Sequence, residues 1–133
     1  MFLSHCVPNP PDKGEKIRAY HEVMHLASRY RIHLACIARE ELEVQAAKAL
    51  AGVCASVYVE RLSRPFALAK AAGRFACGGS LNAEFYARWG LRDYVSKLCR
   101  RVVIRASVVF TSVMMPYAPP GTPILLDMVD VDS

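Results

Sequence analysis

The sequence predicts an α/β fold, a Rossmann-like domain with a mainly parallel sheet flanked by helices. Short apolar runs typical of strands alternate with longer amphipathic stretches typical of helices, and this alternation indicates parallel strands joined by right-handed crossovers. The length of 133 residues suits one domain, while 53% hydrophobic and 22% charged residues exclude a disordered chain. No apolar run reaches the about 20 residues that a membrane-spanning helix requires.

The first half of the chain predicts three strands and two helices. A strand over Phe2 to His5 ends in a proline-rich turn that leads to Gly14. A helix is expected from Glu15 to Arg29, then a strand from Ile32 to Ala38, a helix that begins with acidic residues, and a strand from Ser56 to Leu62. The buried stripes of the two helices are expected to be Ile17, Tyr20, Met24 and Ala27, and Leu42, Ala46, Ala49 and Val53.

The second half predicts two more helices and two more strands. One helix is expected from Pro65 to about Cys77, and the next is marked by the apolar residues Leu91, Val95, Leu98 and Val102. Strands follow at Val108 to Phe110 and from Ile124 onward. Few residues precede the first strand, and the chain stops just beyond the last one, where the ligand crevice of an open α/β sheet forms. We therefore expect the chain to be one domain of a larger protein.

The five cysteines are scattered and never form a C-x-x-C pair. Their odd number and spacing argue against a disulfide framework and against a cysteine-rich zinc site. The N-terminus lacks the charged and then apolar pattern of a signal peptide. A cytoplasmic location is the simplest expectation.

Positive charge is concentrated in one segment. The segment from Arg61 to Arg105 holds ten of the 17 Lys and Arg residues but only two of the 12 acidic residues. Such a segment can mark a contact for nucleic acid or for an anionic membrane, and the plainer interpretation is a solvated helix face. The side chains expected to meet a membrane are Arg64, Phe66, Lys70, Arg74 and Phe75.

A formal H-E-x-x-H motif occurs at His21, Glu22 and His25. Two histidines four residues apart on a helix can bind zinc beside a glutamate that serves as general base. A zinc site also needs a third ligand, and nothing fixes the geometry of the nearby glutamates. Ordinary helix histidines are the favoured interpretation, and a small zinc hydrolase remains the minor alternative.

Two loops carry candidate ligand-binding groups. Asp12, Lys13, Gly14 and Lys16 lie between the first strand and the first helix, where a helix N-terminus attracts phosphate. Neither G-x-G-x-x-G nor a Walker A pattern is present, so nothing indicates NAD or ATP. The acidic run that ends the chain includes Asp130, a candidate catalytic carboxylate at a strand end; the alternative is a loop with helix-capping side chains.

The stretch from Phe2 to Arg18 (FLSHCVPNPPDKGEKIR) resembles the amino-terminal signature of bacterial sugar transferases associated with the exosortase (PEP-CTERM) exopolysaccharide system. These are relatives of the family-4 glycosyltransferases with the GT-B fold. Ser112, the segment Met114 to Tyr117 and the terminal segment from Leu126 to Ser133 also resemble that family. The resemblance covers nearly the whole chain, but only the first of the family's two domains.

The resemblance implies a fold and a set of roles. In that family two Rossmann-like domains face each other; the first supplies acceptor contacts and the second holds the nucleotide sugar. It implies that Gly14 approaches the donor diphosphate and that Asp12, Lys13, Lys16 and Ser112 belong to the substrate-binding set. Asp130 falls near a strand end where many family-4 enzymes carry a histidine.

The leading hypothesis is therefore the acceptor-side domain of a retaining-type, GT-B-like glycosyltransferase. The whole enzyme would transfer a sugar from a nucleotide donor to a saccharide or lipid-linked acceptor, and this domain alone would be inactive. We expect no cofactor, no metal and no nucleic-acid partner, a peripheral contact with the inner face of the cell membrane, and a homodimer of the isolated domain. The alternative from another class is a non-catalytic α/β binding or assembly module.

Overall fold

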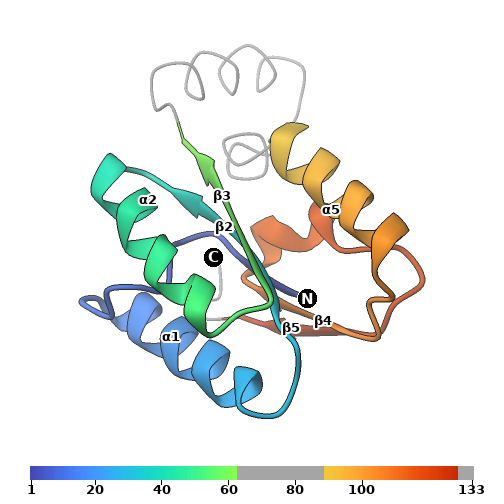
Figure 1. The fold of residues 1–133 in the computed structure, drawn as a ribbon, viewed down its shortest axis with the longest axis horizontal. Coiled ribbons are helices and arrows are strands. Elements are labelled where there is room, and N and C mark those ends of the chain that lie inside the picture. Colours follow the sequence, from blue (N-terminus) through green and yellow to red (C-terminus); the bar gives the residue numbers. More distant parts are fainter. Residues whose placement is uncertain (63–88, 129–133) are drawn as a thin grey trace.

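A computed structural model of the chain describes residues 1–62 and 89–128. It confirms the predicted α/β class, because five parallel strands form one sheet with helices on both faces (Figure 1). The elements in chain order are β1 (Phe2–Ser4), α1 (Gly14–Ala27), β2 (His33–Ala38), α2 (Glu41–Lys48), the 3-10 helix η1 (Ala49–Gly52), β3 (Ser56–Arg61), α5 (Trp89–Arg101), β4 (Ser107–Phe110), the 3-10 helix η2 (Ser112–Tyr117) and β5 (Ile124–Asp127).

The strand order is β3-β2-β1-β4-β5, with all four neighbouring pairs parallel. The short strand β1 lies at the centre, where Phe2 stands beside Leu34 of β2 and Val108 of β4. The connections from β1 and from β4 leave in opposite directions, so the order reverses between these two strands. In open α/β sheets ligands bind at such a reversal, beyond the carboxyl ends of the strands.

The two faces of the sheet carry separate apolar cores. Figure 1 shows α1 and α2 over one face and α5 over the other. Successive strand residues point to opposite faces, so Phe2 joins the core under α1 and α2, whereas Leu3 joins the core under α5 and η2. Burial on both faces explains why β2 is apolar throughout its core residues Leu34 to Ala38.

The predicted helix α1 is present, and its expected buried stripe is confirmed in part: Tyr20 and Ala27 are half-buried and pack against the core. Ile17 is 42% exposed, and the buried residues are Lys16, Ala19 and Val23. The buried face of the helix extends to Lys16, because an acidic partner on α2 holds this side chain inward. The spacing of apolar residues along one helix cannot predict a charged partner on another helix.

The stripe predicted for α2 is also wrong. Leu42 is 77% exposed and Val53 is exposed, while Ala47 and Leu50 are buried. The helix is only eight residues long and continues as η1. The helical geometry therefore changes before the end of the predicted stripe, and the α-helical spacing no longer holds there. By contrast Leu91 and Val95 are buried as expected on α5.

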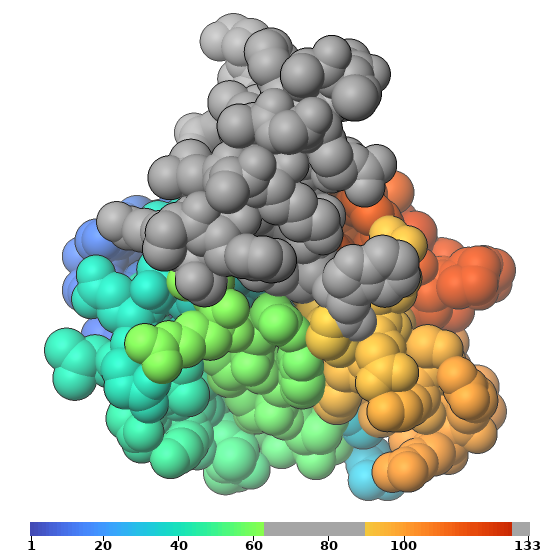
Figure 2. Space-filling view, turned by 90° about the horizontal axis from the view of Figure 1, so that it is seen from above, coloured from blue at the N-terminus to red at the C-terminus, as the bar shows by residue number. Residues whose placement is uncertain are grey.

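Several predicted features lie outside the described residues: the helix from Pro65 to Cys77, the candidate membrane-contact side chains, and Asp130. Within the described ranges, no helix has both the length and the apolar character needed to cross a membrane. Figure 2 shows α2, β3 and α5 adjoining one another on one face of the molecule. The exposed Arg61 of β3 pairs with Glu41 of α2 at 3.1 Å.

Candidate functional site

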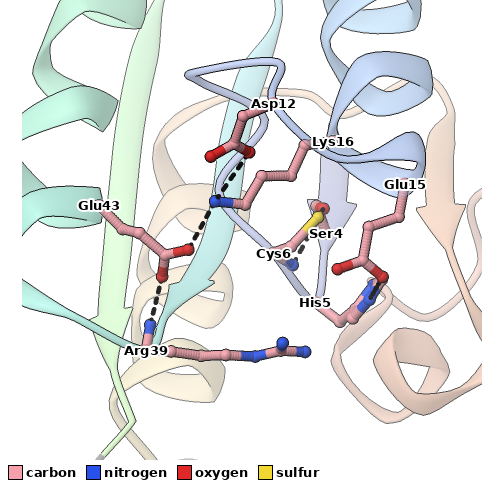
Figure 3. Close-up of polar contacts among 8 residues, drawn as sticks. All are labelled: Ser4, His5, Cys6, Asp12, Glu15, Lys16, Arg39 and Glu43. Carbon is pink, nitrogen blue, oxygen red and sulfur yellow. Dashed lines mark hydrogen bonds and ion pairs between the residues drawn. The ribbon is translucent and has the colours of Figure 1, made fainter.

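Polar side chains gather where β1 and β2 end and α1 and α2 begin. They are shown in Figure 3: Ser4, His5, Cys6, Asp12, Glu15, Lys16, Arg39 and Glu43. Because parallel strands end at the same edge of the sheet, the two strand-to-helix loops meet there. A cavity of about 340 Å³ opens between them, with Cys6, Lys13, Glu15, Lys16 and Arg39 among its lining residues.

Lys16 is the buried centre of a charge network on this edge. Its Nζ lies 2.7 Å from Oε1 of Glu43 and 3.7 Å from Oδ1 of Asp12. The other carboxylate oxygen of Glu43 accepts a hydrogen bond of 2.6 Å from the backbone N–H of Arg39. The network therefore joins α1 to the start of α2.

The pKa values of this pair follow from burial and from the partner. Burial alone would lower the pKa of Lys16, but the hydrogen bond and charge of Glu43 outweigh burial, and the pKa is raised. Burial would likewise raise the pKa of Glu43, yet the bond and charge of Lys16, together with hydrogen bonds from backbone N–H groups such as that of Arg39, lower it overall. Lys16 was expected to neutralise a ligand's charge, but two carboxylates already compensate it.

Lys13 and Gly14 are placed differently from Lys16. Lys13 is exposed and occupies the N-cap position of α1 without a side-chain capping bond. A Cβ added at Gly14 would meet no atom within 4 Å, so packing within the described chain does not require glycine there. The first N–H groups of a helix lack intrahelical partners, and Gly14 leaves open space in front of them.

His5, Cys6 and Glu15 form a second cluster on the same edge. Nε2 of His5 lies 3.2 Å from Oε2 of Glu15, and the His5 ring stacks on Phe110 with centroids 5.9 Å apart. The Sγ of Cys6 lies 3.5 Å from the hydroxyl of Ser4. Burial raises the pKa of the Cys6 thiol to about 11.

Thr111 follows β4 on the far side of the strand reversal. Its backbone has φ 76° and ψ 149°, a combination that is essentially restricted to glycine. Its hydroxyl is buried and has no hydrogen-bond partner among the described residues. The predicted site residue Ser112 follows it as an exposed residue at the start of η2.

The H-E-x-x-H residues lie elsewhere, on α1 beside β5. His21 and His25 are exposed, and Glu22 pairs with Arg18 at 3.1 Å. Three potential metal ligands come within 4.8 Å of one another at one place in the described chain, namely at His5, Cys6 and Glu15. Neither histidine of the motif belongs to that group.

Comparisons with protein-family models, with curated proteins and with solved structures find no match to this chain. Sequence reasoning found the loop with Lys13 and Gly14 but missed the cluster of His5, Cys6 and Glu15 and the roles of Arg39 and Glu43. The signal was available in part, since His5 ends a predicted strand and Cys6 directly follows it in an α/β pattern. Their approach to Glu15 depends on the shape of the intervening loop, which spacing does not give.

Proposed function

We propose that this chain is the acceptor-side, Rossmann-like domain of a GT-B-like glycosyltransferase that acts in exopolysaccharide synthesis. The observation that carries the proposal is the position of the loop from Asp12 to Lys16 beside the cavity at the carboxyl edge of the sheet. This loop belongs to the stretch that resembles the sugar transferases. It supports the proposal because ligands of open parallel sheets bind at this edge.

In this proposal the diphosphate of the nucleotide-sugar donor meets the start of α1. The exposed ammonium group of Lys13 and the unpaired N–H groups at the helix N-terminus would stabilise the negative charge that develops on the leaving group. Gly14 would let the diphosphate come close to the backbone. Lys16 acts indirectly, because its bond to Glu43 fixes the first turn of α1.

The reaction would need a second domain to hold the nucleotide sugar, as in the family that the chain resembles. The acceptor would be a saccharide or a lipid-linked saccharide, and the domain would work in the cytoplasm at the inner face of the membrane. Purified residues 1–133 should therefore give no transfer or hydrolysis of nucleotide sugars. Turnover by this chain alone, measured as release of nucleoside diphosphate, would contradict the two-domain proposal.

Binding of uridine diphosphate tests the donor-facing role directly. We expect millimolar uridine diphosphate to shift the backbone amide NMR signals of residues 12–16. Lys13→Ala should weaken this binding about two- to fivefold, in line with about 0.3–1 kcal/mol for an exposed charge at a helix end. Lys48→Ala is the matched control, because Lys48 is equally exposed but lies at the far end of α2. Absence of shifts in residues 12–16, or equal weakening by both variants, would contradict the proposal.

A further inference from the structure

The cluster of His5, Cys6 and Glu15 has a use that sugar transfer does not require. We propose that these three side chains form a binding site for a divalent transition metal ion, with zinc the ion that suits them best. The inference does not depend on the proposed function, because it stands on the placement of the three donor atoms. It also differs from the zinc hypothesis built on His21 and His25.

The spacing of the donor atoms fits one metal ion. The three ligand atoms all lie within 4.8 Å of one another, and His5 Nε2 and Glu15 Oε2 are 3.2 Å apart. Tetrahedral zinc with bonds of about 2.0–2.3 Å holds its ligand atoms about 3.3–3.6 Å apart. The histidine–glutamate pair, at 3.2 Å, already lies close to this distance, and the sulfur of Cys6 lies within 4.8 Å of both atoms.

The donor set selects the kind of metal. A sulfur, an imidazole nitrogen and a carboxylate oxygen suit zinc, whereas magnesium and calcium prefer oxygen ligands alone. Binding replaces the thiol proton of Cys6, which leaves to solvent, so that a thiolate and a carboxylate balance the two positive charges of the ion. Three protein ligands leave a fourth tetrahedral position for an outside ligand.

The surroundings hold the ligands and keep the fourth position accessible. The His5 ring lies nearly parallel to Phe110, at an interplanar angle of 8°, which limits its rotation. The hydroxyl of Ser4 accepts a bond from the Cys6 backbone N–H at 3.3 Å. Cys6 and Glu15 both line the 340 Å³ cavity, so an outside ligand could reach the metal through this cavity.

Cobalt and zinc titrations of the chelator-treated 133-residue chain test this site. We expect one Co²⁺ per chain, with the near-ultraviolet charge-transfer band of a cobalt–thiolate bond, and displacement of that ion by Zn²⁺. Cys6→Ser should remove the band, and Glu15→Gln should weaken zinc binding by more than about 100-fold, since even loss of an outer-shell partner costs about 10–100-fold.

Two control variants separate this site from other metal-binding groups. Cys99→Ser removes an exposed thiol on α5, and His25→Ala disrupts the H-E-x-x-H motif; both should keep the band and the zinc affinity. Circular dichroism checks that each variant is folded. If Cys6→Ser fails to fold, the cobalt spectrum of the unchanged chain still tests the proposal, because the site requires a thiolate band at one Co²⁺ per chain. A stoichiometry well below one, a spectrum without the thiolate band, or loss of binding in either control would overturn the proposal.

Discussion

Thr111 carries backbone strain next to the reversal of strand order. A threonine in this conformation costs about 1–3 kcal/mol, whereas glycine adopts it freely. We expect Thr111→Gly to raise the free energy of unfolding by about 1 kcal/mol, because released strain exceeds the extra entropy that glycine brings to the unfolded chain. Urea denaturation measures the change, with Ser112→Gly as the neighbouring control that lacks such strain. A loss of stability in Thr111→Gly equal to that of the control would show that the strain is absent.

The buried ion pair between Lys16 and Glu43 makes stability depend on pH. Side-chain exposure is 6% for Lys16 and 16% for Glu43, so Glu43→Gln leaves a buried ammonium group with weak compensation and should cost about 2–3 kcal/mol at neutral pH. The pKa of Glu43 in the folded state lies below its ordinary value of 4.5. The unfolded state therefore takes up the proton first as pH falls, and the stability that the carboxylate contributes is lost below pH 4.5.

Urea denaturation of both proteins across the pH range checks this linkage. The advantage of the unchanged chain over Glu43→Gln should be constant near neutrality and shrink below pH 4.5. On the alkaline side the raised pKa of Lys16 keeps the pair charged until the pH passes its ordinary value of 10.5. A difference that does not change between neutral and strongly acidic solution would refute the role given to this pair.

At the scale of elements, the first turns of α1 and α5 offer a matched comparison. Each contains a glycine, but a Cβ at Gly90 would lie 2.7 Å from the hydroxyl oxygen of Tyr58, whereas one at Gly14 would meet nothing. Gly14→Ala should keep or raise the Tm, because alanine favours a helix by up to about 1 kcal/mol over glycine. Gly90→Ala should lower the Tm, since the bond between Tyr58 and Glu60 must move.

The same Gly14→Ala variant separates stability from ligand binding. If Gly14 is kept small for a diphosphate, the added methyl group should weaken uridine diphosphate binding in a protein that is at least as stable as before. Calorimetric scans together with the amide titration would show both effects. Weaker folding with unchanged binding would assign Gly14 a purely structural role.

Sequence patterns predicted the elements better than their orientation. The alternation of apolar and amphipathic stretches identified all five described strands. The signal is strongest for β2, because a strand buried on both faces leaves a continuous apolar signature. The buried face of α1 was predicted only in part, since the partner that draws Lys16 inward lies on another helix. The buried face of α2 was misplaced, since the chain continues there as η1. The loop with Lys13 and Gly14 could be predicted because it follows the first strand. The approach of Glu15 to His5 could not, because it depends on three-dimensional loop geometry.

At the scale of the whole molecule, β5 is the more exposed of the two edge strands of the described sheet. Leu125 is 67% exposed, and Ile124, Leu126 and Met128 are exposed near it. An apolar edge strand invites pairing with another chain, so light scattering should show dimers or larger species. Leu125→Lys should shift the chain toward monomer, whereas Leu42→Lys, at an even more exposed leucine on α2, should not. A monomer at high concentration would contradict this expectation.

The central position of β1 has a consequence for synthesis on the ribosome. β1 is made first, yet its neighbour β4 places Val108 beside Phe2, and roughly 100 residues must be added in between, which takes about 5–20 s at ordinary elongation rates. During that time β1 can pair with β2, but the backbone N–H and C=O groups on its other edge stay unpaired and can bind a strand of another chain. The emerging chain should therefore depend on a chaperone until β4 leaves the exit tunnel and completes the sheet.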